Sequence, residues 1–147
     1  MIRLSSKKGE YGIRAVLALA LHDRAVPVSV KSIVRKEQLS IRFMEQVMNA
    51  LKVNGLVEAV RGPHGGYRLT RTPTEISLHQ VLQATDGKGA KPLNTGPFRP
   101  SLHSRILSDL VSEIENRLVN HLNDLHFDLL VRRVKELEGK EAMMFHI

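Results

Sequence analysis

The chain has 147 residues and contains no cysteine. This absence excludes disulfide bonds, thiolate metal sites and a cysteine nucleophile. No apolar run approaches the roughly 20 residues that a membrane span needs. The N-terminus also lacks the charged, apolar and small-residue layout of a signal peptide. We therefore expect a cytoplasmic protein of one domain, or one domain plus an extension, without a membrane partner.

Sequence patterns of catalysis are also missing. None of the seven histidines forms a His-x-x-x-His pair or an H-E-x-x-H motif. No serine–histidine–acid arrangement and no paired-carboxylate motif stands out. The segment Gly62-x-x-Gly65-Gly66 resembles a phosphate loop, but it lies between two expected strands and lacks the Gly-Lys-Ser/Thr ending. These absences predict that the protein is not an enzyme and needs no cofactor.

Positive charge is concentrated in the first half of the chain. The formal net charge is +7, and residues 1–71 hold 13 Lys and Arg against 5 Asp and Glu. Residues 72–147 hold 9 against 10. A generally basic soluble protein is one interpretation. We favour a polyanionic partner, namely nucleic acid, for the first half.

The segment Val60–Leu69 predicts a β-hairpin with a basic tip. Strands are expected at 56–60 and 67–70, and the glycines between them supply the positive φ angles of a tight reversal. Arg61, at the base of this hairpin, and His64, at its tip, bring cationic side chains to it.

A helix pair precedes the hairpin. Helices are expected over 8–23, 30–37 and 41–54, with Ser40 as the N-cap of the third. A short strand is possible at Val28-Ser29. The last two helices have helix-turn-helix proportions, so the third would enter the major groove of DNA. Its expected core face is Met44, Val47, Met48 and Leu51, and its expected outward face is Ile41, Arg42, Phe43, Glu45, Gln46 and Asn49.

Some of these side chains are typical base readers. Gln46 can bond adenine in two places, and Glu45 can accept from cytosine N4. Arg61 suits a phosphate or a narrow minor groove. Glu45, Arg61 and His64 could instead be ordinary solvated side chains. Ser5, Lys7 and Lys8, at the start of the first helix, suit a phosphate or form a frayed basic end.

The C-terminal half predicts an extended helical arm. Ser77 is expected to cap a helix over 78–85, and residues 86–101 read as a long loop. Ser101 is expected to cap a helix to about 123, and another helix spans about 126–138. The long helix has apolar residues every four positions, so it either covers its own core or pairs with a second copy. We favour the dimer.

The predicted fold class is mainly α with a small β-hairpin. It consists of a winged helix-turn-helix domain and a long C-terminal dimerisation helix. The predicted divisions are a DNA-binding domain over 1–85, a flexible loop over 86–100, and a dimerisation helix with a C-terminal helix and tail over 101–147.

Several segments together resemble the Rrf-type winged-helix transcription regulators, the group that contains IscR and CymR. The closest match is Val60–Leu69. The other segments are Leu4–Tyr11, Val28–Ile33, Leu39-Ser40-x-x-Phe43-Met44-Glu45-Gln46, Leu51-Lys52-x-Asn54-Gly55-Leu56-Val57 and Ile76-Ser77-Leu78-x-x-Val81-Leu82. The resemblance covers essentially the whole chain, and its motifs are specific in combination.

The resemblance implies a homodimer that binds a partly palindromic double-stranded DNA operator, and a repressor is favoured. Phe43 replaces the tyrosine usual at its position, which puts a hydroxyl contact to phosphate in doubt. The predicted DNA-binding residues, from the patterns and the resemblance together, are Ser5, Lys7, Lys8, Tyr11, Ser40, Arg42, Phe43, Glu45, Gln46, Arg61, Gly62, His64 and Gly65.

The chain departs from the family at the loop over 86–101. Many members place three cysteines there and bind an iron–sulfur cluster, whereas this loop has none. His103 lies near the position of a histidine ligand, but one histidine will not hold such a cluster. Two alternatives follow. The chain could act through a regulatory protein partner, as the resemblance to CymR suggests, docking on the loop or the tail. It could also sense a metal through His103 and Asp86.

Overall fold

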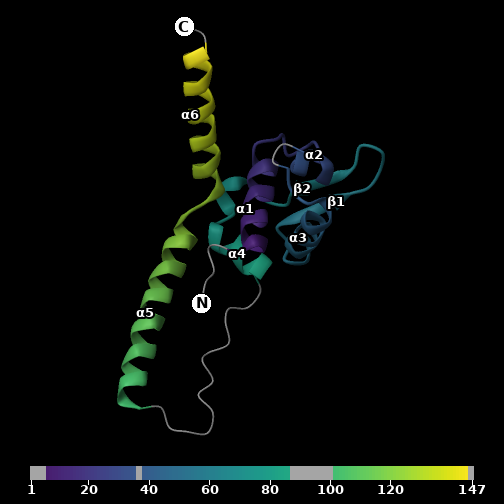
Figure 1. The fold of residues 1–147 in the computed structure, drawn as a ribbon. Coiled ribbons are helices and arrows are strands. Elements are labelled where there is room, and N and C mark those ends of the chain that lie inside the picture. The colour runs from purple at the N-terminus through teal and green to yellow at the C-terminus, as the bar shows by residue number, and fades with distance from the viewer. Residues whose placement is uncertain (1–5, 36–37, 87–100, 146–147) are drawn as a thin grey trace.

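The computed structural model describes residues 6–35, 38–86 and 101–145. Helices predominate, and the order of elements is shown in Figure 1. In chain order they are α1 (Lys7–Ala20), α2 (Val30–Arg35), α3 (Ile41–Val53), β1 (Val57–Val60), β2 (Gly66–Leu69), the 3-10 turn η1 (Pro73–Glu75), α4 (Leu78–Asp86), α5 (Leu102–Asp124) and α6 (Phe127–Phe145). The predicted class, mainly helical with one hairpin and a long C-terminal helix, is confirmed.

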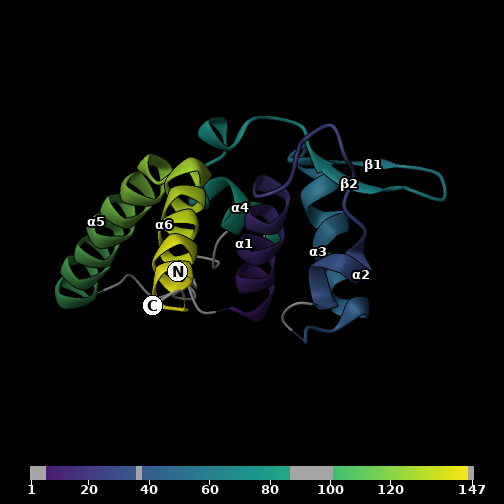
Figure 2. The ribbon, with the colours of Figure 1, turned by 90° about the horizontal axis from the view of Figure 1, so that it is seen from above.

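One core joins the N-terminal helices, the hairpin and the start of α6. The predicted core face of α3 is confirmed, because Met44, Val47, Met48 and Leu51 are all fully buried. Helix α1 lies at the centre of the molecule and packs against α3 on one side and α4 and α6 on the other (Figure 2). Apolar residues at helical spacing therefore build the core that the sequence predicts.

Strand β2 forms backbone hydrogen bonds along both of its edges. Strands β1 and β2 are antiparallel, with Val57 opposite Leu69 and Val60 opposite Gly66. On the other edge, Val28 and Tyr67 exchange two backbone hydrogen bonds of 2.8 Å. The possible strand at Val28-Ser29 is thus a single bridge. It ties the segment before α2 to the hairpin.

The three serines predicted as N-caps stand at the starts of α3, α4 and α5. The Ser40 hydroxyl accepts from the Phe43 amide at 3.3 Å, and the Ser101 hydroxyl accepts from the Ser104 amide at 3.2 Å. The Ser77 hydroxyl accepts from the backbone amide of Gln80, while the side-chain oxygen of Gln80 accepts from the backbone amide of Ser77 at 2.9 Å. This reciprocal pair is a capping box, and it fixes the start of α4.

Helices α5 and α6 form an arm that is attached to the body at their junction (Figure 1). There the Phe127 amide donates to the Ile76 carbonyl at 3.0 Å, and the Leu78 amide donates to the Leu125 carbonyl at 2.8 Å. The Phe127 side chain is fully buried in the core. The arm is therefore held by these two backbone hydrogen bonds and by buried side chains, among them Phe127 and Leu122.

The predicted ends of two helices are wrong, and most of the predicted loop lies outside the described residues. Helix α6 continues to Phe145 instead of ending near 138, because a single glycine at 139 costs a helix only about 1 kcal/mol. Helix α1 ends at Ala20 rather than 23. Of the predicted flexible loop over 86–100, only Asp86 is described, as the last residue of α4. No helix in the described part of the chain is long and apolar enough to cross a membrane.

Candidate nucleic-acid interface

The first turns of α3 present polar side chains to solvent. Arg42, Glu45, Gln46 and Asn49 are exposed, while the opposite face of the helix fills the core. Within the described residues none of these four side chains makes a hydrogen bond or an ion pair. The structure therefore leaves the predicted base readers Glu45 and Gln46 free to contact an external partner.

Tyr11 and Phe43 fix the start of α3. The two rings meet edge to face with centroids 4.7 Å apart, and the Tyr11 hydroxyl accepts from the Ser40 amide at 3.3 Å. Tyr11 is only 9% exposed. The prediction that Phe43 faces outward is wrong, because its ring is half-buried against Tyr11. Both residues position the helix rather than presenting a free side chain.

The tip of the hairpin carries Arg61 and His64, both exposed. The Gly65 amide donates to the Gly62 carbonyl at 3.0 Å, so Pro63 and His64 occupy the corners of a turn. Arg61 lies just beyond the last strand pair, at the tip rather than at the predicted base. Within the described residues no carboxylate pairs with Arg61, whereas Arg68 further down the hairpin pairs with Glu58.

The glycines of the hairpin are needed for two different reasons. Gly62 has a φ of 124°, as predicted for a tight reversal. Gly65 and Gly66 do not have positive φ angles; they lack space for a side chain instead. A Cβ at Gly65 would lie 2.2 Å from the Val60 carbonyl oxygen, and one at Gly66 would lie 2.3 Å from the Val28 carbonyl oxygen. The expectation that all the loop glycines supply positive φ is therefore wrong for these two.

Replacing Gly65 by alanine is expected to distort the hairpin tip. The new methyl group must displace backbone atoms, which we estimate costs about 1–3 kcal/mol. Thermal unfolding and DNA affinity both report the change. Gly139→Ala is the matched control, because a Cβ there meets nothing within 4 Å and alanine favours a helix. Equal effects of the two substitutions on stability would contradict this view of the tip.

The start of α1 already holds a carboxylate. The Ser6 hydroxyl accepts from the Gly9 amide at 3.0 Å and donates to Asp86 at 2.5 Å. A negative charge near these amides opposes a phosphate at the same place. Lys7 is exposed and Lys8 is half-buried, so Lys7 is the freer of the two lysines. Ser5 lies outside the described residues.

The described residues give no support to a metal site at His103 and Asp86. His103 is exposed on the first turn of α5, and Asp86 is bonded to Ser6. The described residues contain no group of three or more His, Cys, Asp and Glu side chains that could hold a metal ion. Nothing in the described geometry supports the predicted histidine and carboxylate sensor.

Comparisons with known proteins agree on one family. Residues 5–133 match the Rrf2 family model, which is described as an iron-dependent transcriptional regulator. The regulator IscR of Escherichia coli O1:K1 is 40% identical over 151 residues, which cover 95% of this chain and 88% of that protein. IscR of Pectobacterium carotovorum is 33% identical and covers 93% and 84%.

Solved structures show the same architecture. The T. potens IscR structure matches with a TM-score of 0.73 and 28% identity, covering 92% of this chain and 90% of that one. CymR of B. subtilis, described as a global cysteine regulator, matches with a TM-score of 0.64 and 29% identity, covering 90% and 98%. The helix pair, hairpin and long helix thus define a winged-helix transcriptional regulator. The chain belongs to the Rrf2 family.

The iron dependence in the family's description does not fit the donor set of this chain. Iron–sulfur clusters are normally held by thiolates, and the chain has no cysteine. Residues 87–100, next to α5, contain no Cys, His, Asp or Glu at all. The chain therefore cannot supply the thiolates that a cluster needs.

Proposed function

We propose that this chain is a homodimeric, sequence-specific DNA-binding repressor that works without an iron–sulfur cluster. The observation that carries the proposal is the free polar surface formed by the first turns of α3 and the hairpin tip. Both lie on the side of α1 away from α5 and α6 (Figures 1 and 2). The excess of positive charge in residues 1–71 supports a polyanionic partner for this side.

In this proposal α3 reads the major groove. Its N-terminal turns project base-reading side chains, with Gln46 suited to adenine and Glu45 suited to cytosine N4. A carboxylate that faces DNA repels phosphates unless it bonds a base, so Glu45 would discriminate between sequences more than it adds affinity. Arg61 at the hairpin tip suits the adjacent minor groove or a phosphate, and His64 lies beside it.

The arm supports the dimer. Six large apolar residues of α5 are exposed by 43–67%: Leu102, Ile106, Leu107, Leu110, Val111 and Ile114. Within the described residues nothing covers them, so the alternative that α5 wraps its own core is not favoured. A second copy that packs along this face would remove the apolar surface from water and place two α3 helices on two half-sites.

Selection of bound duplexes from a random pool, at a stated salt concentration, tests the proposal. We expect enrichment of a partly palindromic sequence whose half-sites lie one helical turn, or a multiple of it, apart. Affinity should fall steeply as salt rises, because phosphate contacts release counterions. If no sequence is enriched, or if the enriched site has no two half-sites, the chain does not bind DNA as a two-fold symmetric dimer. A reporter assay with the selected operator separates repression from activation.

Glu45→Ala is expected to weaken discrimination rather than overall binding. One good base contact contributes about 1–3 kcal/mol of discrimination, so the preference for operator over scrambled duplex should fall roughly 5- to 100-fold. Binding to the scrambled duplex should stay equal or tighten, since a negative charge is lost. Glu136→Ala, an exposed glutamate on α6, is the matched control. Equal losses on both duplexes would remove Glu45 from the base readers.

A further inference from the structure

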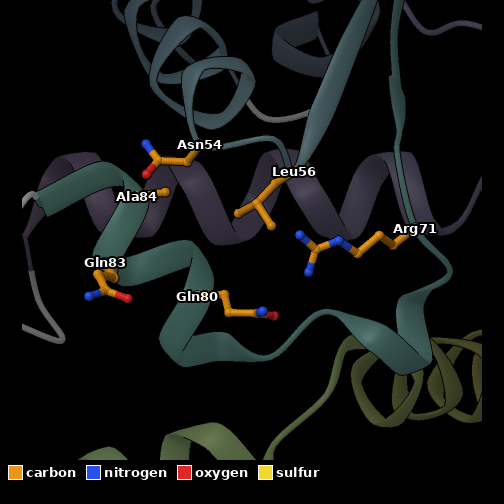
Figure 3. Close-up of a pocket in the computed structure, with 6 residues that line it drawn as sticks. All are labelled: Asn54, Leu56, Arg71, Gln80, Gln83 and Ala84. Atoms are coloured by element: carbon orange, nitrogen blue, oxygen red, sulfur yellow. The ribbon is translucent and has the colours of Figure 1, made fainter.

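A small pocket lies at the base of the hairpin, where three elements meet (Figure 3). Its volume is about 200 Å³. Its lining comes from the residue just after α3, from residues at the base of the hairpin and from α4. The lining residues are Asn54, Leu56, Arg71, Gln80, Gln83 and Ala84.

The pocket has one positive charge and no negative one. Arg71 is exposed and makes no ion pair with any of the described residues. Arg14 and Arg68 on the same body pair with Glu10 and Glu58, whereas Arg42 and Arg61, on the proposed DNA-binding side, are unpaired within the described residues as Arg71 is. None of the six lining residues is acidic. The unpaired guanidinium therefore favours an anionic ligand.

Amide groups around Arg71 are held in place for hydrogen bonding. The Gln80 carbonyl oxygen accepts from the Ser77 amide at 2.9 Å, which leaves its NH₂ group free to donate. Figure 3 shows the ends of Gln80 and Arg71 pointing toward each other below Leu56. The Asn54 NH₂ group donates to the Ala50 carbonyl at 2.8 Å, so its own carbonyl oxygen remains free. The pocket thus offers a cation and an amide donor in a mostly polar lining.

DNA is not the anion that this pocket suits. The register of the hairpin pairs Val57 with Leu69 at its base and Val60 with Gly66 at its tip. Arg71 lies two residues after Leu69, so it lies at the end of the hairpin opposite to Arg61 and His64. Asn54 lies just beyond the C-terminal end of α3, whereas the proposed base readers are near its start.

We propose that this pocket binds a small organic carboxylate. The planar guanidinium of Arg71 matches a carboxylate with two parallel hydrogen bonds, and Gln80 donates a third. A single cation suits a monoanion better than a phosphate dianion. Leu56 and Ala84, both buried, add a small apolar part to a mostly polar lining, which suits a carboxylate with a short hydrocarbon body. A bound ligand would contact the end of α3, the base of the hairpin and α4 together.

NMR titration of the full chain with sodium acetate and with sodium lactate tests the site without DNA. At constant ionic strength, we expect saturable shifts of the side-chain amide signals of Asn54, Gln80 and Gln83. Arg71→Gln should weaken binding at least about tenfold, because the charged bidentate contact is lost. Arg71→Lys should fall between, since it keeps the charge without the planar fork. Arg133→Gln, an exposed arginine of α6, carries the same charge change and should leave binding unchanged.

Three results would overturn the site. They are equal shifts with sodium chloride, equal binding by Arg71→Gln and the unchanged chain, and saturation by inorganic phosphate but not by either carboxylate. The amide spectrum of each variant also reports its folding. Because no DNA is present, failure here leaves the proposed repressor function standing, and failure of the operator selection leaves the pocket standing.

Discussion

Leu110→Glu in α5 is expected to separate the proposed dimer into monomers and to lower operator affinity on the order of 100-fold. Leu110 is 51% exposed near the middle of the apolar face of α5. In a two-fold dimer each substitution acts twice, and each places a carboxylate against apolar side chains. Burying an unpaired charge costs several kcal/mol per ion. Analytical ultracentrifugation measures the change in mass, and a binding titration on the selected operator measures affinity.

Ser108→Glu is the matched control for this substitution. It adds the same charge to the same helix, about 160° around the axis from Leu110. We expect the control to stay dimeric and to bind DNA normally. If both variants remain dimers, the apolar face of α5 is not the contact. If Leu110→Glu is monomeric yet binds the operator with full affinity, the two-fold reading of half-sites is wrong.

Much of the DNA-binding body can be predicted from local sequence. Ser40 is a good N-cap before a helical apolar pattern, so the start and the core face of α3 follow from periodicity and capping. The hairpin follows from glycines between two short apolar runs. These features depend on residues that are neighbours along the chain, which is why a single sequence is sufficient to predict them.

Contacts between distant residues could not be predicted in this way. The Tyr11–Phe43 ring contact and the Ser6–Asp86 hydrogen bond join segments about 30 and 80 residues apart. Tyr11 therefore reads from the sequence as a DNA contact, although its side chain supports α3. Likewise, Gly66 has no space for a Cβ only because Val28 pairs with Tyr67. Tertiary packing, rather than local propensity, determines these roles.

Phe127→Ala is expected to destabilise the protein by about 3–5 kcal/mol, because it empties the site of a large, fully buried aromatic ring. Small domains are stable by only about 5–15 kcal/mol, so this loss is a large fraction of the total. Phe127 lies at the junction of α5 and α6, where backbone hydrogen bonds join this junction to Ile76 and Leu78. The variant should therefore loosen the arm as well as the core. Denaturant unfolding at a fixed protein concentration measures the loss.

Phe145→Ala is the control, since it removes the same ring from the same helix where the side chain is 87% exposed. Its effect on the free energy of unfolding should stay within about 0.5 kcal/mol.

The stability of Phe127→Leu should lie between those of the two alanine variants, because leucine fills part of the space. If this position requires only apolar volume, Phe127→Leu should recover operator binding together with stability. If Phe127→Leu regains stability but DNA affinity stays low, the ring also sets the position of the arm relative to α3. A loss below about 1 kcal/mol for Phe127→Ala would contradict a structural role of this ring, because the arm would then be held by its other contacts.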